Sequence, residues 1–540
     1  MYFLPLFPAF LIVTIGIALY AIGLVAHRFF FAPLTGFPGP TLAAVTGWYE
    51  FYYDYWFNGQ YIFKIEEMHK KYGPIVRINP EELSIHDPEF YNEIYVTESK
   101  RRTNNYDVFC KGIDFDGDSY HPSVLNISLT HVITGSHLLT TDHDLHRRRR
   151  KPLEPFFSRM GISRLQPMLA EVVRKLEQRL MEYRGTDQVI RLDHAFSSFS
   201  GDIIGKICWE DEKEFLDDPD FAPEWYNVIH TIVRSIPLFT GFPSLVQMLG
   251  YIPESVLLWA FPQGQSFTRF KTIAHQHILK AKLEKSFTKS KSTSVNEHVS
   301  LFRFIVNSDM PESELSDGRL AKEAQVVLGG GTASTAHTLG FVSYYILSNK
   351  HIQTRLQGEL REVMVGWPLK VPSWADLERV QYLQTLIKEG LRLSYGVMHR
   401  LPRVSPDLPI QYKQWTIPPG APVGMSAYLM HSDKNVYPKP SEFIPERWLG
   451  DVNPAMYRSY VPFCRGSRNC LGMNLAQAEM SLAIAVLFRP GGPNLKLYDT
   501  TERDVKQVHD FLIPLPDVRS KGMTNLYHAS RAIGEPADVS

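Results

Sequence analysis

The first 27 residues carry the most strongly apolar pattern in the chain. Residues 2–26 are 25 consecutive uncharged and mostly apolar positions, and about 20 such residues are enough to cross the hydrocarbon core of a bilayer. A cleaved signal peptide is the alternative, but the run is longer than a signal core, has no basic residue before it and lacks a small-residue cleavage site. The pattern predicts one transmembrane anchor helix over residues 1–27. Arg28, directly after it, places the rest of the chain on the cytosolic side.

Residues 28–40 are predicted to be a proline-rich hinge. The stretch from Pro33 to Pro40 contains three prolines and two glycines, which exclude a continuous helix. Beyond the hinge there is no long low-complexity linker and no internal repeat. Residues 41–540 are therefore expected to form one large domain.

Within this domain, helical periodicity dominates and strand-like alternation is brief. Residues 75–78 and 83–86 alternate as two short paired strands do, with a break at Asn79-Pro80. Apolar spacing predicts helices over residues 320–347, over 381–395 and after residue 475. Residues 229–278 are helical in pattern but interrupted by four prolines, and they form either a membrane-dipping substrate entrance or a buried helix pair. The fold class is thus mainly α with a small β-sheet, plus one N-terminal transmembrane helix.

Charge and cysteine content narrow the function classes. Lys and Arg together number 57, as do Asp and Glu, so a nucleic-acid partner is not expected. Only four cysteines occur in 540 residues, too few for a disulfide framework and suited to a reducing compartment.

The stretch from Phe463 to Gly472 carries the strongest chemical signal. It reads as a turn that delivers Cys470 to the start of a helix, where backbone N–H groups favour a thiolate, the form that binds iron. Gly466 and Gly472 permit close backbone approaches, Phe463 can shield the sulfur, and Arg468 can pair with a carboxylate.

The complete pattern Phe-x-x-Gly-x-Arg-x-Cys-x-Gly resembles the haem-ligand loop of the cytochrome P450 monooxygenases. The resemblance implies the P450 fold for residues 41–540 and haem b with Cys470 as the thiolate ligand of its iron. Phe463, Gly466, Arg468 and Gly472 would then surround the cofactor. Cys464 lacks these flanking residues and is expected to be structural.

Three further motifs keep the order that the resemblance implies. His146 and Arg150, spaced by four positions in a basic run, match residues that reach the haem propionates, and Arg403 resembles another propionate partner. Glu389 and Arg392, spaced by three, are expected to lock to Arg447 as a brace under the thiolate loop. Val397 and Met398 would face substrate. The other basic residues near His146 are either a solvated helix face or part of the docking face for a redox partner.

A glycine-rich stretch interrupts the long helix predicted over residues 320–347. Gly329, Gly330 and Gly331 should each cost about 1 kcal/mol relative to alanine, and close approach of a flat cofactor would explain them. The family places an acid and then an alcohol nearby, whereas this chain has Ala333 and Ser334 followed by Thr335. Ser334 and Thr335 are therefore the candidate catalytic residues, and proton delivery is the step that Ala333 alters.

The resemblance implies a monooxygenase that inserts one atom of O2 into an apolar small molecule, with electrons from NADPH through NADPH-cytochrome P450 reductase. Segments such as residues 71–80 and His509-Asp510-Phe511 look most like fungal trichodiene-oxygenase-type members of the family, which points to a terpenoid or similar secondary metabolite. The implied location is the endoplasmic reticulum membrane, in contact with lipid, with a single span and a cytosolic catalytic domain.

Two other functions stay open. A haem-thiolate isomerase or dehydratase would keep Cys470 without needing NADPH, and Ala333 favours it; a non-catalytic haem-binding sensor would use no NADPH with any ligand. Residues 116–135 are longer than expected for this family and are either a substrate-site lid or a translated intron, and the glycosylation sequon at Asn126 is expected to be unused.

Overall fold

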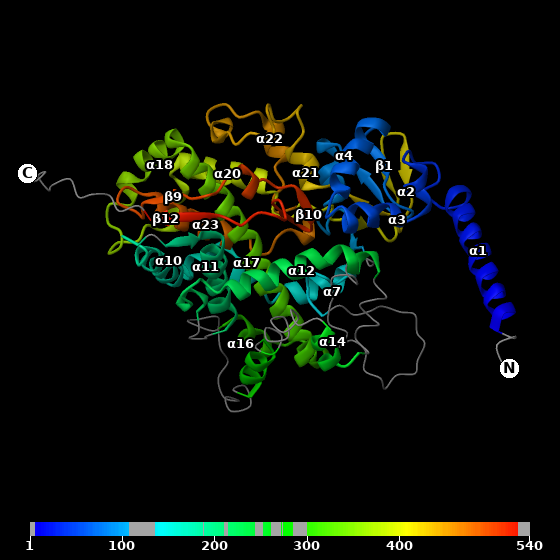
Figure 1. Cartoon of the computed structure of the whole chain (residues 1–540), viewed down its shortest axis with the longest axis horizontal. Coiled ribbons are helices and arrows are strands. Elements are labelled where there is room, and N and C mark those ends of the chain that lie inside the picture. The colour runs from blue at the N-terminus through cyan, green and yellow to red at the C-terminus, as the bar shows by residue number, and fades with distance from the viewer. Residues whose placement is uncertain are drawn as a thin grey trace, which may run out of the picture.

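The computed structural model describes residues 6–106, 135–186, 188–209, 214–242, 252–260, 272, 274–283 and 300–527; the predicted loop at 116–135 lies outside these residues except for Gly135. Helix α1 (Leu6–Phe30) stands apart from the body of the protein (Figure 1). Its segment Phe10–Phe30 is long and apolar enough to cross a membrane. The helix therefore continues three residues beyond the predicted end at residue 27, into the predicted hinge.

An aromatic-rich segment follows the hinge and leads into the largest sheet. It comprises α2 (Thr41–Val45), α3 (Trp48–Phe51), a π-helix η1 (Tyr52–Trp56) and α4 (Tyr61–Tyr72). The sheet has the order β1-β2-β8-β5-β3, and its strands are β1 (Ile75–Arg77), β2 (Leu83–Ile85), β8 (Pro422–Gly424), β5 (Arg403–Val404) and β3 (Asn104–Asn105). Only β2 and β8 pair in parallel, with Leu83 opposite Val423. The predicted strand pair is thus confirmed as one edge of a five-stranded sheet that joins residues 75–105 to residues 403–424.

The remaining strands form small antiparallel sheets. They are β4 (Val189–Arg191) with β12 (Thr524–Tyr527) and β9 (Leu495–Leu497), β6 (Ile410–Tyr412) with β7 (Trp415–Ile417), and β10 (His509–Phe511) with β11 (Ile513–Leu515). The short helices are α5 (Tyr91–Ile94), α7 (His143–Arg150), α8 (Glu154–Phe157), α9 (Arg159–Arg164), α14 (Glu254–Ala260), α16 (Leu301–Val306), α19 (Trp374–Glu378), α21 (Ala427–His431) and α22 (Pro454–Ser459). The 3-10 turns are η2 (Pro88–Phe90), η4 (Phe215–Asp217), η6 (Glu312–Leu315), η7 (Pro445–Trp448), η8 (Gly466–Arg468) and η9 (Glu502–Asp504).

Helix α17 (Asp317–Ser348) runs through the centre of the helical part (Figure 1). The other long helices are α10 (Gln166–Met181), α11 (Leu192–Cys208), α12 (Pro223–Gly241), α18 (Lys350–Val363), α20 (Gln381–Ser394) and α23 (Met473–Phe488). Close approaches fix this packing: a Cβ on Gly390 of α20 would collide with Val342 of α17. The prediction that Pro237 interrupts this helix is wrong. Helix α12 continues past Pro237 to Gly241, and the proline side chain is buried.

The predicted brace forms around the fully buried Glu389 of α20. Both carboxylate oxygens accept from Arg392, at 2.8 and 2.9 Å. Arg447 donates at 3.0 Å, and the Trp448 indole donates at 2.9 Å. The buried charge is thus paired and hydrogen-bonded on all sides, the condition under which a buried ion is tolerated.

Replacing one member of this brace should destabilise the whole domain. We expect Glu389→Gln to lower the free energy of unfolding by about 3–5 kcal/mol, because it leaves guanidinium groups buried without a counter-charge. The measurement is the thermal unfolding midpoint of the full-length protein. Glu378→Gln is the matched control, since Glu378 pairs with the exposed Arg159 at the surface and should cost less than about 1 kcal/mol. Equal shifts for the two variants would contradict the brace.

Candidate active site

The loop that carries Cys470 is closed by its own backbone. The Cys470 N–H donates to the Phe463 carbonyl at 2.8 Å. Gly466 has a φ of +75°, and a Cβ there would lie 2.3 Å from the Val96 carbonyl oxygen. Only glycine fits this position, for both conformational and steric reasons. Gly472 differs from the prediction: its φ is −86° and a Cβ on it would meet no described atom within 4 Å.

The Cys470 sulfur lies in a recess at the start of α23. The residue is solvent-accessible, yet protein atoms surround the sulfur closely enough that burial raises the pKa of the thiol, while the Gly472 N–H and the Arg150 charge act in the opposite direction. Helix α23 begins at Met473, so the cysteine lies two residues before the Gly472 cap rather than within the first turn. A bound metal cation would offset the cost of the buried thiolate, since a coordinating thiol is deprotonated.

Cys464 has a different environment. Its sulfur lies 3.6 Å from the Tyr91 hydroxyl, and its side chain packs against the apolar cluster around the large sheet. Its φ of +55° places it in the left-handed region, where it terminates the turn after Val461. These contacts are those of a structural side chain.

Four residues predicted to bind the cofactor converge at one place. Burial lowers the pKa of His146, and the positive charges of Arg468, Arg150 and Arg403 lower it further, which places all three guanidinium groups within electrostatic range of this ring. His146 is 2% exposed, and its Nδ1 has no hydrogen-bond partner among the described residues. Positive charge concentrated around a neutral imidazole that has a nitrogen without a hydrogen-bond partner favours the binding of anionic groups.

The guanidinium groups of this cluster are held mostly by neutral oxygens, although Arg150 also pairs with the Glu154 carboxylate at 3.2 Å. Arg150 donates to the carbonyl and side chain of Asn469, at 2.6 and 2.9 Å, and so contacts the residue before Cys470. Arg403 donates to the Asn105 side chain at 2.8 Å across the paired strands β5 and β3. Arg468 donates to the Thr140 carbonyl at 2.7 Å and to the Thr141 carbonyl at 2.8 Å. Because most of these partners carry no charge, the cluster keeps most of its positive charge.

The rest of the basic run divides between the core and the surface. Arg149 turns inward and pairs with Glu314 at 2.7 Å, so it cannot belong to a docking face. Arg147, Arg148 and Lys151 are exposed. Asp142 caps the helix by accepting from the Leu145 N–H at 2.8 Å, which sets the direction of α7 and so of His146.

The glycine-rich turn of α17 serves two purposes. A Cβ on Gly331 would lie 2.9 Å from Ile204, so this glycine allows α11 to approach rather than a cofactor. Gly330 is exposed in the middle of the longest helix, and a Cβ on it would meet no described atom within 4 Å. One glycine therefore serves packing, and another leaves an open surface beside Ser334, whose hydroxyl donates to the Gly330 carbonyl at 3.1 Å. Thr335 is 5% exposed and turns into the core.

Comparison with known proteins identifies the family. The Cytochrome P450 family profile matches residues 43–490, more than half of the chain. The chain belongs to the cytochrome P450 family. The P450 fold expected from the sequence is thereby confirmed, as is the monooxygenase class.

The relatives are fungal P450s that match over nearly their whole length. Cytochrome P450 monooxygenase oblB of Aspergillus clavatus is 52% identical over 514 residues, which are 94% of this chain and 95% of the relative. The fusicoccadiene C-8 hydroxylase of Phomopsis amygdali is 48% identical over 504 residues, 92% of each chain. Stellatic acid synthase of Emericella variicolor is 42% identical over 530 residues, 94% of this chain and 92% of the relative.

Membership in the P450 family implies a haem iron with a cysteine thiolate ligand, and the geometry fits such a group. Haem has two carboxylates and a flat apolar ring. The cations around His146 suit the carboxylates, and the unpartnered Nδ1 supplies one more polar contact. The bare surface at Gly330 suits close approach of a ring, and the Cys470 sulfur is accessible.

The segment that follows α20 and contains Met398 and His399 contacts the β10–β11 hairpin. The sequence did not reveal these contacts. His399 lies 3.0 Å from Asp510, which raises the pKa of His399 against the effect of its burial. The Met398 N–H donates to the Leu512 carbonyl at 3.1 Å. Met398 is fully buried in the cluster around Ile65, so it packs in the core and does not face substrate as predicted.

Sequence reasoning also missed a surface patch that we call the aromatic patch, formed by Leu42, Trp48 and Trp56. These side chains are 57%, 58% and 61% exposed. Trp48 packs against Phe242, at the end of α12, with ring centroids 5.3 Å apart. The sequence contains a signal for this patch, because residues 48–57 include eight aromatic side chains in ten positions.

Replacing each cysteine of the loop in turn should show which of the two binds the haem iron of this P450. We expect Cys470→Ser to abolish the thiolate-type spectrum of the reduced haem with carbon monoxide, because serine cannot supply the sulfur ligand. Cys464→Ser should preserve it. Loss of the signal in the Cys464 variant alone would reverse the assignment.

A glycine pair tests the fit of the loop. Gly466→Ala should reduce the haem content of the purified P450, since the new Cβ meets the Val96 carbonyl. Gly450→Ala is the control: it has a similar φ of +68° but no described atom within 4 Å, so it carries only the conformational cost of about 1 kcal/mol. Equal haem content in the two variants would show that the collision is unimportant.

Proposed function

We propose that this P450 oxygenates an apolar terpenoid in a fungal biosynthetic pathway, with haem b held by Cys470. The observation that carries the proposal is the exposed Cys470 of the Phe463–Gly472 loop, whose neighbour Asn469 is held by Arg150. The relatives support the substrate class, because one is named for hydroxylation of fusicoccadiene and another for synthesis of stellatic acid.

Each residue has a distinct task in this proposal. Cys470 would supply the thiolate, while Arg150, Arg403, Arg468 and His146 would hold the propionates. Phe463, Gly466 and Gly472 shape the thiolate side. When bound, haem supplies the oxygen chemistry: substrate C–H, O2, two electrons and two protons yield the alcohol and water.

Electrons are proposed to come from NADPH through NADPH-cytochrome P450 reductase. The exposed Arg147 and Arg148 lie between His146 and Arg150 on α7, and the exposed Lys151 directly follows this helix. Positive charge at this place would attract an acidic partner and orient it toward the thiolate side.

Proton handling falls to Ser334. Its hydroxyl can donate to a bound acceptor instead of to the Gly330 carbonyl, which lies 3.1 Å away. Ala333 provides no acid. A haem-thiolate isomerase or dehydratase would need no such acid, and a requirement for NADPH distinguishes it from the monooxygenase.

We further propose that residues 1–27 anchor the protein in the endoplasmic reticulum membrane, with residues 28–40 as hinge and residues 41–540 as the cytosolic catalytic domain. The aromatic patch supports a second contact with lipid, since tryptophan favours the membrane interface. Figure 1 shows α2 and α3 at the same end of the molecule as α1. Of residues 229–278, which the sequence predicts to form either a membrane-dipping entrance or a buried helix pair, residues 243–251, 261–271 and 273 lie outside the described part of the chain.

A pair of hydroxyl variants tests proton handling. Ser334→Ala should lower the product formed per NADPH by on the order of tenfold and release peroxide instead, because a positioned proton donor is lost. Thr335→Ala should change this ratio much less, since Thr335 is buried. If Ser334→Ala leaves both ratio and rate unchanged while NADPH is still required, protons take another route. Wild-type turnover without NADPH would establish the isomerase.

Truncation tests the second membrane contact. Removal of residues 1–32 should release only part of the protein from membranes. Adding Trp48→Ser and Trp56→Ser to the truncated protein should weaken its binding to vesicles a further tenfold or more, because the free energy of binding falls with the apolar area that the two substitutions remove. The matched control substitutes Val365 and Leu369 in the same way. These side chains are 85% and 97% exposed, and they follow α18, which lies at the other end of the molecule from α1 (Figure 1). Full release by truncation alone would contradict the contact.

A further inference from the structure

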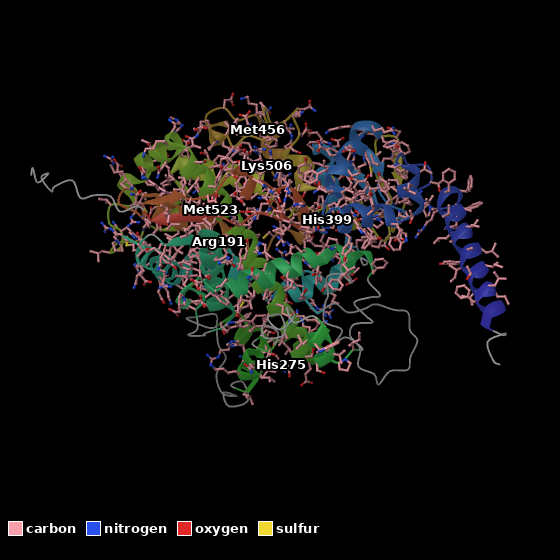
Figure 2. The ribbon with its side chains drawn as sticks, viewed as in Figure 1. Arg191, His275, His399, Met456, Lys506 and Met523 are labelled. Atoms are coloured by element: carbon pink, nitrogen blue, oxygen red, sulfur yellow. The ribbon has the colours of Figure 1, made fainter. Side chains whose placement is uncertain are left out.

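A cavity of about 400 Å³ lies between α12, α17 and the C-terminal strands. Its floor includes Ala333 and Gly340 of α17 and Met523. At its mouth lie Asn227 and Lys521, both exposed. Arg191 and Met523, which line it, lie close together in Figure 2. The volume exceeds the roughly 30 Å³ share of one water molecule many times over, and the lining is polar enough to hold water.

His337 is the polar side chain of α17 in this cavity, one helical turn after Ala333. Its Nε2 is buried without a hydrogen-bond partner among the described residues. Burial and the nearby His230 lower the pKa of His337 to about 4, although the Gln507 side chain acts in the opposite direction. The ring is therefore neutral near pH 7 and retains a nitrogen that can exchange protons with water.

His230 extends this polar path toward the surface. It lies on α12 across the cavity, stacks on Tyr226 with ring centroids 3.8 Å apart, and engages the Tyr226 carbonyl through Nδ1 at 2.8 Å. That contact occupies one ring nitrogen and leaves the other available.

A purely structural histidine looks different in this protein. His431 is completely buried, and both its ring nitrogens are bonded, to the Arg392 carbonyl and to the Val461 N–H, each at 2.9 Å. His337 has no such pair of bonds. Its position beside Ala333, the place where the family carries an acid, therefore calls for a functional explanation.

We propose that His337 passes protons from cavity water to Ser334 and so replaces the missing acid; this role rests on the proposed monooxygenase function. Ser334 precedes His337 by three residues, which puts both on neighbouring parts of one helix surface. Ala333, one turn before His337, also lines the cavity, and its small methyl group leaves room there for water. In each transfer one ring nitrogen accepts a proton from water as the other releases one toward Ser334, so the ring stays neutral and no electron moves.

The first test measures water access without turnover. In full-length, haem-loaded protein, exchange of the imidazole C2 hydrogen for deuterium is followed by mass spectrometry at each histidine. His431, whose pKa burial lowers to about 3, is the internal buried reference, and the exposed His275, far from Arg191 and Met523 in Figure 2, is the accessible one. We expect His337 to exchange on the order of tenfold faster than His431, as a group open to water should. Exchange as slow as that of His431 would overturn the proposal.

The second test uses variants. His337→Phe should lower product per NADPH and raise peroxide, while the carbon monoxide spectrum and substrate-induced spectral shift stay unchanged; His275→Phe is the control. Adding Ala333→Asp to His337→Phe should restore coupling, because it returns an acid to the relay. Unchanged coupling in His337→Phe, with NADPH still required, would overturn the relay alone. Turnover independent of NADPH would instead overturn the proposed function, whatever the exchange rate of His337.

Discussion

The buried Glu389 carboxylate is the constraint on which the thiolate loop depends. Arg392, Arg447 and Trp448 all donate to it, so α20 and the turn η7 are locked together. His431 carries this constraint to the loop, because it joins the Arg392 carbonyl to the Val461 N–H, two residues before Phe463. The low pKa of His431, about 3, keeps Nε2 free of a proton and able to accept. The position of Cys470 is therefore set by a buried ionic group on another helix.

A second constraint acts on the opposite side of the loop, where positive charge is concentrated. Arg150 holds Asn469 directly, while Arg403 arrives from the sheet and Arg468 from the loop itself. Like charges this close are unfavourable unless an anion binds among them. The same arrangement that costs stability thus favours a dicarboxylate cofactor. It also links the sheet and α7 to the loop that carries Cys470.

The central helix shows how one short sequence can meet two demands. Gly331 admits α11 through its contact with Ile204, whereas Gly330 leaves the surface next to Ser334 open. Ala333 then lies at the boundary between this surface and the cavity that contains His337. The helix stays continuous because its remaining turns are buried against α11, α20 and α23, and tertiary packing outweighs the helix cost of glycine.

The sequence by itself determined the N-terminal apolar helix, the mainly helical class and the pairing of Glu389 with Arg392, because these features depend on local periodicity or on spacings within a short motif. The preference for Cys470 over Cys464 as the candidate ligand rests on the same kind of local spacing. Tertiary structure alone decided that Arg149 turns inward, that Met398 packs in the core, that Gly331 meets Ile204 and that His399 pairs with Asp510. It also formed the aromatic patch with Phe242 and the cavity at His337. Each of these depends on segments far apart in the chain, and no local pattern specifies which distant side chain will fill the space beside it.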